Sequence, residues 1–292
     1  MFSNTIGIKN TAIGQNSFVS NTTGSNNTSV GFFALNANTT GVGNTSLGSR
    51  ALSSNSTGDY NTATGFEALI NNDAGGNTAN GYYSLRSNTT GMANTGIGST
   101  ALYTNSTGVG NTAVGQSALF YNVGGSNNTA VGYNSFQAGA DYSNSTAIGY
   151  DVFISADNQV RLGDFAITSI GGQVGWTTLS DERLKKNIQP SNFGLDFILK
   201  LKPVTYNYKA EGQKGILYTG FIAQDVEKFA KEIGYDFSGV DTPKNENDFY
   251  GLRYAEFVAP LTKATQELNA KVEAQQEMIK ALQQEIEALK KK

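Results

Sequence analysis

The sequence reads NTGIGSTAL at residues 94–102, NTAVGQSAL at residues 111–119 and NTAVGYNSF at residues 128–136. This pattern occurs nine times from Asn10 onward, at a step of 17 along the chain except for a step of 16 between Asn61 and Asn77. Counted from the first Asn (Ser145 in the last copy), Thr holds position two, Gly position five and a large apolar residue position nine of every copy. Short repeats with Gly at fixed places are typical of β-solenoids. We therefore predict a β-roll or β-solenoid shaft over residues 1–155.

One coil of this length has room for two short strands and two turns, with two large apolar side chains inside. We expect these to be the residue at position nine and the residue before the position-five Gly. A later Gly recurs in seven copies, and we predict that the short copy lacks a residue just after Gly75. Two side chains per coil make a thin core. We therefore expect several copies, preferably three, to share an axial core, which would also hide the sheet edges. A flexible Asn/Gly/Ser linker fits less well, because four residue columns keep register over nine copies.

The composition narrows the function classes. The 292 residues include no His and no Cys, and 15% are charged with a net charge of −3. Imidazole triads, thiolate zinc sites and disulfides are therefore excluded, and we expect no metal and no cofactor. The slight negative charge argues against a nucleic-acid partner. The start lacks a basic and an apolar region, and no apolar run is long enough to span a bilayer, so we expect no signal peptide and no membrane insertion.

Charged residues become frequent from Ser180 onward, which marks a change of domain. We predict a β neck over residues 156–179, with Trp176 as a packing anchor, and a small α+β module over residues 180–253. Within the module, the expected elements are helices at 195–201 and 224–232, strands at 204–208 and 218–222, and a loop at 236–248. Three aromatic residues of the module are expected to pack and not to bind a ligand: Tyr206, Tyr208 and Phe221.

A heptad pattern over residues 254–292 predicts a coiled coil. Its a positions are Val258, Thr265, Val272, Ile279 and Ile286, and its d positions are Leu261, Leu268, Gln275, Leu282 and Leu289. β-branched residues at a with Leu at d favour two strands. The shaft argues for three, so the heptads alone leave dimer and trimer open.

The segment LSDERLKKNI at residues 179–188 would, taken alone, be a helix start with Ser180 as N-cap. It stands together with LKPVTYNY at 201–208, GFIAQD at 220–225 and YAEFVAPL at 254–261. In this combination, residues 176–292 resemble the C-terminal intramolecular chaperone of phage tail spikes, neck appendages and endosialidases. The coils of residues 4–155 resemble the head repeats of trimeric bacterial adhesins and the shafts of phage tail fibres.

The chaperone resemblance implies self-cleavage by a Ser–Lys dyad. Ser180 would be the nucleophile that attacks the carbonyl of Leu179, and Lys185 the general base, supported by Asp181 and Arg183. Lys186 is the alternative base. A Ser hydroxyl needs such a partner near neutral pH, and a chain without His can supply a Lys. Residues five apart lie on different faces of an α-helix, so Ser180 must lie on the loop before any helix.

The combined interpretation is a homotrimeric tail fibre of a phage or phage-like particle. It would fold in the host cytoplasm, become part of the virion outside the cell, and bind a glycan or protein receptor on the host surface. The C-terminal part would bring the chains into register and then be released, which leaves a kinetically stable shaft. The alternative is a bacterial surface adhesin stalk with the same chaperone.

Two further functions are less favoured. Regular Thr columns on a flat solenoid could bind ice. A glycosidase is disfavoured, because Asp59, Glu67 and Asp73 occur in single repeats instead of as a carboxylate pair. Four aromatic residues that depart from the repeat could either stack on sugars or pack internally; they are Tyr82, Tyr83, Tyr103 and Tyr121.

Overall fold

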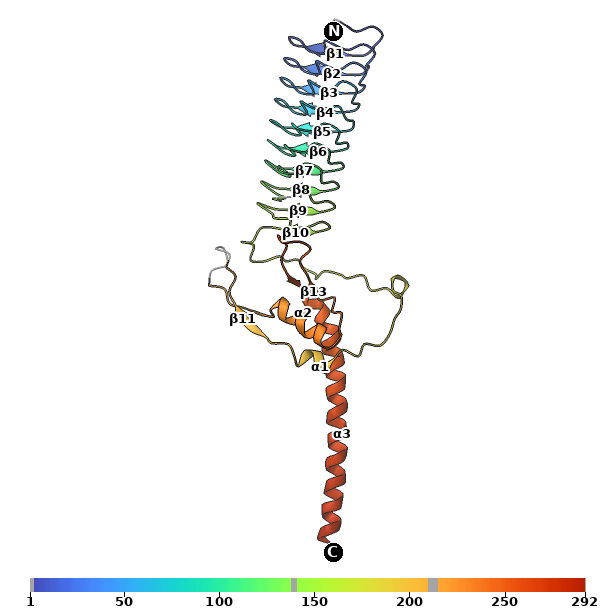
Figure 1. Ribbon diagram of the computed structural model, residues 1–292, viewed down its shortest axis with the longest axis vertical. Coiled ribbons are helices and arrows are strands. Elements are labelled where there is room, and N and C mark those ends of the chain that lie inside the picture. The colour runs from blue at the N-terminus through green and yellow to red at the C-terminus, as the bar shows by residue number, and fades with distance from the viewer. Residues whose placement is uncertain (1–2, 138–140, 210–214, 292) are drawn as a thin grey trace. The chain divides into compact units, whose positions relative to one another are not determined.

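The computed structural model describes residues 3–137, 141–209 and 215–291. The chain divides into two compact units, Met1–Ile167 and Thr168–Lys292. The first unit holds the repeat and the second holds the helices and two small sheets (Figure 1).

The repeat unit is a β-solenoid in which each coil adds one three-residue strand to a parallel sheet (Figure 1). Equivalent residues of neighbouring coils pair directly, so Thr95 lies beside Thr112 and Ile97 beside Val114. The predicted solenoid is confirmed, but the predicted second strand per coil is wrong, because the described coils continue through turns and bends. The ten strands are β1 Thr11–Ile13, β2 Thr28–Val30, β3 Thr45–Leu47, β4 Thr62–Thr64, β5 Thr78–Asn80, β6 Thr95–Ile97, β7 Thr112–Val114, β8 Thr129–Val131, β9 Thr146–Ile148 and β10 Val160–Leu162.

The interior of the solenoid is filled by one large side chain per coil. The position-nine residue is fully buried from Phe18 to Leu119, and the small central residue of strands β2 to β9 is buried beside it. The residue before the position-five Gly, which we expected inside, points outward: Leu47 is 49% exposed and Ile97 41%. Side chains alternate along a strand, so a buried small residue at position three forces position four to the outer face. In the last coil, Val152 and Ile154 fill the interior in place of the predicted Phe153.

Two columns of buried Asn close each coil with side-chain hydrogen bonds. In the first column, Asn44 Nδ2 donates to the carbonyl of Gly58 (2.8 Å) and its Oδ1 accepts from Asn61 N (2.9 Å). In the second column, Asn55 Nδ2 donates to Asn38 Oδ1 (3.2 Å) and to the carbonyl of Gly58 (2.9 Å). Buried backbone groups need such partners, which explains why Asn recurs at these two positions.

The short coil, which begins at Asn61, lacks its residue at a different place from the one predicted. The carbonyl of Ala74 accepts from Asn61 Nδ2 and Asn72 Nδ2, both at 2.8 Å. In the preceding coil, the carbonyl of Gly58 accepts the equivalent bonds. Ala74 therefore holds the late Gly position, and the missing residue lies between Asn72 and Ala74 instead of after Gly75.

Asp73 compensates for this deletion with its side chain. Its Oδ1 accepts from the backbone N–H groups of Ser56 (2.8 Å) and Thr57 (2.6 Å), and from Gly58 N (3.3 Å). In a regular coil, a backbone carbonyl takes these bonds, as Ser106 O does from three consecutive N–H groups. A carboxylate therefore replaces a carbonyl where the chain is one residue shorter.

The second unit is an α+β module followed by a long helix, as predicted. Its elements are the 3₁₀ turn η1 Glu182–Leu184, α1 Leu195–Ile198, the antiparallel pair β11 Val204–Tyr206 and β12 Tyr218–Gly220, α2 Ala223–Glu232, the antiparallel pair β13 Val240–Asp241 and β14 Gly251–Leu252, the 3₁₀ turn η3 Tyr254–Phe257, and α3 Val258–Lys290. The predicted loop at 236–248 contains β13, because its partner β14 lies beyond that range and leaves no local pattern.

The module has a small aromatic core that includes Phe197, Phe237 and Phe257. Phe197 on α1 is fully buried, and its ring lies edge-on to that of Tyr235 at 5.2 Å. The backbone N–H of Leu195 donates to Glu267 Oε2 at 2.8 Å, which joins the start of α1 to α3. The module is thus built around the first turns of α3.

α3 exposes the apolar residues of the heptad pattern. Val258, Leu261, Leu268, Ile279, Leu282, Ile286 and Leu289 are each about half exposed or more. The predicted helix is confirmed, whereas its pairing with other helices stays a prediction. The described parts of the chain include no helix with the length and apolar character needed to cross a bilayer.

Candidate active site

Ser180 lies on an irregular segment that leads into a single 3₁₀ turn. Residues 175–181 form neither helix nor strand, and η1 then spans only Glu182–Leu184. Asp181, not Ser180, caps the turn, because its Oδ1 accepts from Arg183 N at 2.8 Å. The expectation that Ser180 precedes any helix is met, and the residue chosen from the sequence as N-cap is displaced by one.

The 3₁₀ turn brings Ser180 and Lys185 together. Both ends of the turn are extended: Asp181 has ψ 134° and Lys185 has φ −111° and ψ 149°. The chain therefore turns back on itself, and Lys185 Nζ lies 2.8 Å from Ser180 Oγ as a hydrogen-bond donor. No described hydrogen bond joins Lys186, the alternative base, to Ser180. The geometry supplies what a Ser nucleophile needs, an amine at hydrogen-bonding distance from its hydroxyl.

Asp181 is held by Arg183. Arg183 Nε donates to both carboxylate oxygens, at 3.0 and 3.1 Å, and Nη2 donates to Oδ2 at 2.6 Å. These hydrogen bonds, with that from the Arg183 backbone N–H, hold the pKa of the Asp181 carboxyl below its ordinary value. The carboxylate in turn raises the pKa of Arg183. The carboxylate of Asp181, the residue after Ser180, is thus engaged by Arg183. The two residues predicted to support the site are therefore in contact with each other.

The site is open in a single chain. Leu179, on the other side of the predicted scissile bond, is 82% exposed, and Trp176 is 88% exposed. The predicted role of Trp176 as a packing anchor is therefore not fulfilled within one chain. Leu184 and Ile188 are also exposed, at 70% and 60%. These four large apolar side chains lie in the segment that holds the Ser–Lys contact. Together they form an exposed apolar surface whose contact with water is unfavourable.

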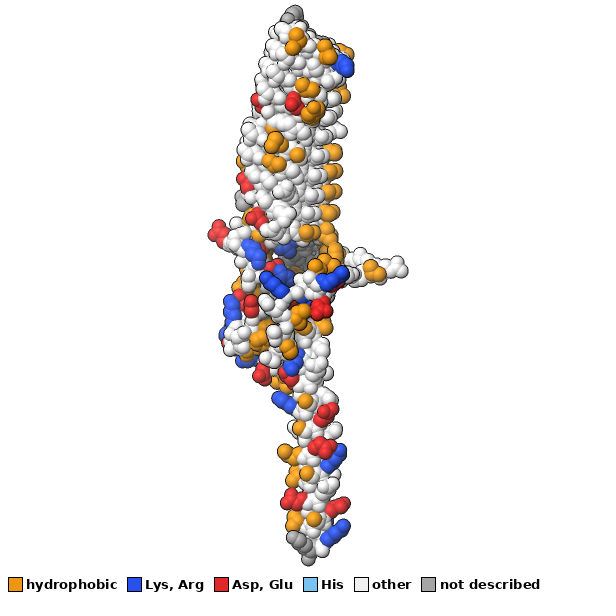
Figure 2. All heavy atoms as spheres, turned by 90° about the vertical axis from the view of Figure 1, so that its right-hand side faces the viewer, with side chains coloured by type: hydrophobic (Ala, Val, Ile, Leu, Met, Phe, Trp, Pro, Cys, Tyr) orange, Lys and Arg blue, Asp and Glu red, His pale blue; other side chains and the backbone are white. Residues whose placement is uncertain are grey.

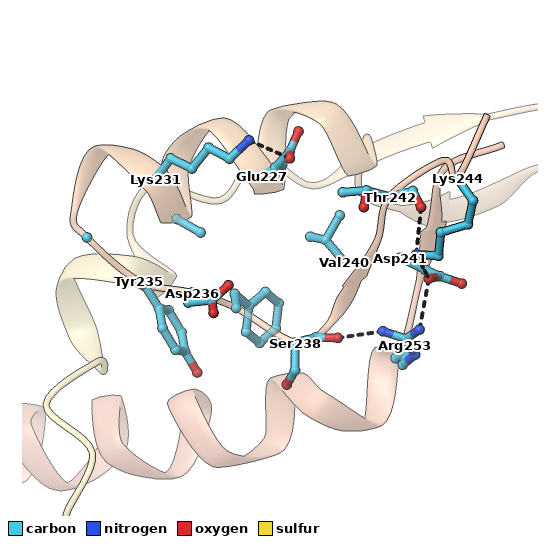
Figure 3. Close-up of a pocket in the computed structure, with 13 residues that line it drawn as sticks. Glu227, Lys231, Tyr235, Asp236, Ser238, Val240, Asp241, Thr242, Lys244 and Arg253 are labelled. Carbon is cyan, nitrogen blue, oxygen red and sulfur yellow. Dashed lines mark hydrogen bonds and ion pairs between the residues drawn. The ribbon is translucent and has the colours of Figure 1, made fainter. Parts of the chain in front are cut away.

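Two hollows in the described part of the module are lined by other residues than this contact. A cavity of about 540 Å³ is lined by charged residues of α2 and of the β13 region, where Lys231 pairs with Glu227 and Arg253 with Asp241 (Figure 3). A second hollow of about 400 Å³ is lined by residues that include the three aromatics expected to pack, Tyr206, Tyr208 and Phe221. Phe221 packs against the aromatic core. A hydrogen bond with Tyr208 raises the pKa of Tyr206 to about 12.

The described residues contain no group of three or more acidic side chains placed to hold a metal ion. Sequence reasoning missed one charged cluster, in the repeat unit. Glu67 is buried and pairs with Arg50 (3.2 Å) and with Arg86 (3.0 Å). Arg50 and Glu67 hold equivalent positions in successive copies, so the repeat itself could have placed them side by side.

Comparison with known proteins bears on the second unit alone. Neither curated proteins nor solved structures gave a match to the chain. Residues 180–235, which begin at the candidate nucleophile and end beyond α2, match the model of a peptidase family described as the chaperone of endosialidase. This segment is therefore similar to that chaperone family, which indicates autoproteolytic chaperone activity in the second unit.

Proposed function

We propose that the chain is a fibre protein of a phage or phage-like particle that attaches to a host surface. Its C-terminal part, residues 180–292, would assemble three chains and then be released by cleavage between Leu179 and Ser180. The observation that carries the proposal is the 2.8 Å contact between Lys185 Nζ and Ser180 Oγ. It lies inside the segment that matches the chaperone family.

The reaction begins with the hydroxyl of Ser180. A neutral Lys185 amine takes the proton from Oγ while Oγ bonds to the carbonyl carbon of Leu179. The C–N bond to Ser180 then breaks, and its electron pair stays on the nitrogen, which takes the proton back from Lys185. Leu179 is now joined to Ser180 through an ester.

Water completes the cleavage. The water oxygen adds to the ester carbonyl of Leu179 while Lys185 accepts one of its protons. The ester C–O bond breaks, the Ser180 hydroxyl is restored with the proton from Lys185, and Leu179 ends as a carboxylate. Each chain carries out this reaction once, because the products are residues 1–179 and residues 180–292.

Assembly of several copies is supported by two exposed apolar features. The first is the outward column of the solenoid sheet, with Leu47, Ile97 and Ile148 each more than 40% exposed. The second is the heptad face of α3. Repeating apolar surfaces of this kind are typical of contacts between proteins, and both suit a symmetric assembly of identical chains, for which we propose a homotrimer. The copies would therefore meet through the outer faces of closed solenoids.

Assembly and cleavage are coupled in this proposal through the exposed residues around the site. A second copy that covered Trp176, Leu179 and Leu184 would remove water from Lys185. Burial disfavours a charged amine, so contact between copies would produce the neutral form that the reaction needs. Cleavage would then follow correct assembly and leave a shaft without its folding template, which is kinetically stable.

The test is the mass of the full chain under denaturing conditions. The wild type should give two products cut before Ser180, while Ser180→Ala should stay intact at 31.0 kDa. Lys185→Ala should slow the cut by about 10²–10⁴-fold, and Lys186→Ala is the matched control that should cut normally. A Ser180→Ala chain cut at the same bond would refute the mechanism. Recovery in purified particles, as opposed to a cell-surface fraction, separates the tail fibre from the adhesin stalk.

A further inference from the structure

Six aromatic rings form a continuous file across four coils of the solenoid. Neighbouring centroids are 5.8, 3.9, 6.0, 5.0 and 4.9 Å apart. Coils are stacked at the usual strand spacing of about 4.8 Å, so the file covers about 14 Å along the solenoid. In order, the rings belong to Phe66, Tyr82, Tyr83, Tyr103, Phe120 and Tyr121.

The file remains accessible in spite of its ring contacts. Tyr82 is 50% exposed and Tyr121 is 55% exposed, and Phe66 is 39% exposed. The interior of the solenoid is filled by the position-nine column, so the six rings lie outside it. The file is instead an apolar surface with phenol groups on it, the composition that marks binding surfaces.

A charged cluster lies against the middle of the file. The Arg86 guanidinium is 5.0 Å from the Tyr83 ring centroid and 6.0 Å from that of Tyr103. Its Nε donates to Glu67 Oε2 (3.0 Å), while Glu67 Oε1 accepts from Arg50 Nη1 (3.2 Å). Glu67 is only 5% exposed, so it acts as an anchor that fixes both guanidinium groups. Two cations on one carboxylate leave a local excess of positive charge.

This charge stands out because the repeat unit carries few charged side chains, and the face of it drawn in Figure 2 is mostly white. The file also differs from the surface proposed for contact between copies. That surface repeats in successive coils at the position before the Gly, whereas the joined rings and the Arg–Glu–Arg cluster belong to a few coils only. A feature confined to part of a repeat suits a ligand better than a symmetric contact that follows the whole repeat.

We propose that the ring file and Arg86 bind an acidic oligosaccharide. The C–H faces of sugar rings pack on aromatic faces, whose π-electrons are negative, and sugar hydroxyls pair with phenol groups. The sugar acid group, a carboxylate or phosphate, would accept from the free guanidinium edge of Arg86. The length of the file suits several linked sugars. This inference rests on the proposed attachment function and deepens it by naming the receptor class and its site.

The experiment is binding of the purified full chain to an array of bacterial surface oligosaccharides with acidic and neutral members. The wild type should be retained on acidic members, and raising the salt to about 0.5 M should weaken the binding. The double variant Tyr82→Ala/Tyr121→Ala should weaken it by at least about tenfold. Both residues are half exposed, so the coil should still fold. Arg86→Gln should abolish the preference for acidic over neutral members.

The matched control is Tyr150→Ala, which removes an exposed ring stacked on Tyr133 outside the file. It should bind as the wild type does. Retention on no acidic member, equal retention on neutral members, or unchanged binding by the double variant would each overturn the proposal. The same preparations are checked for cleavage and for trimer mass. If the chain cleaves and assembles but binds no acidic glycan, the inference about this site is refuted and the proposed function is not.

Discussion

Asp181, which caps a single 3₁₀ turn, forms a two-pronged ion pair with Arg183 in that turn, with Nη2–Oδ2 and Nε–Oδ1 distances of 2.6 and 3.0 Å. The pair stands between Ser180 and Lys185 in sequence and fixes the turn that brings these two side chains together. A carboxylate engaged with Arg183 has less attraction for the Lys185 amine. In the proposed mechanism, the pair would therefore act on Ser180 and Lys185 in two ways, through geometry and through charge.

Loss of the Asp181 carboxylate should slow self-cleavage. Asp181→Ala removes both the ion pair and the acceptor for Arg183 N, whereas Asp181→Asn keeps an acceptor for the turn. We expect Asp181→Ala to slow the appearance of the two products more than Asp181→Asn does, and less than Lys185→Ala. The measurement is a time course on denaturing gels. Equal rates for wild type and Asp181→Ala would remove Asp181 from the supporting role.

The ion pair also predicts how the turn responds to acid. Because the pKa of Asp181 is lowered in the folded chain, the pair stabilises the turn above the ordinary carboxyl pKa. Its contribution is lost as the pH falls through the lowered value. Carboxyl NMR should show the Asp181 pKa below that of an ordinary Asp, and Arg183→Gln, which keeps only the backbone N–H donor, should raise it toward the ordinary range. An unchanged titration in Arg183→Gln would contradict this origin of the shift.

Asp73 should matter more than other surface acids of the solenoid. Asp73→Ala leaves the N–H groups of Ser56 and Thr57 without their acceptor, and we expect a loss of about 1–2 kcal/mol in the free energy of unfolding. Asp59→Ala is the control, because Asp59 Oδ1 accepts from Val42 N only in the described structure. Replacing Asp73 by Ser-Thr should restore a regular coil. Thermal or denaturant unfolding measures the stability of all three variants. Equal losses of stability in Asp73→Ala and Asp59→Ala would argue against the role of the Asp73 carboxylate as a substitute for a backbone carbonyl.

The outward apolar column predicts the surface through which copies meet. Ile97→Asp places a charge on the sheet face without touching the interior, and we expect it to weaken the contact between solenoids, so that the cleaved product of residues 1–179 shifts from trimer toward monomer. Val109→Asp, at an exposed residue outside the strands, is the control. Sedimentation measures the mass of each. If both variants remain trimers, this face does not carry the contact.

The same column gives an expectation for the ice-binding alternative. Its Thr neighbours, such as Thr28 and Thr45, lie side by side on the sheet face. When copies cover that face, it cannot meet an ice lattice. We therefore expect no thermal hysteresis from the assembled protein, and measurable hysteresis would show that the sheet face is free in solution.

Local regularity in the chain, a constant repeat length and a heptad, was enough to predict the solenoid and the helix of residues 258–290. The segment that carries the Ser–Lys pair was predicted only from its resemblance to a known family, because taken alone it is typical of a helix start. The constant step showed which residues of successive coils are equivalent, and the structure places these residues side by side, as Thr95 and Thr112 are.

Three-dimensional packing was needed to learn which side of the strand faces inward, where the short coil lost its residue, and how Lys185 reaches Ser180. A repeat shows which residues are equivalent. It does not show which of the two apolar positions, position nine or the position before the Gly, is buried in the narrow interior. That choice depends on the buried Asn bonds and the small residue at position three. In the same way, residues five apart in sequence meet only because the helix between them is a single 3₁₀ turn.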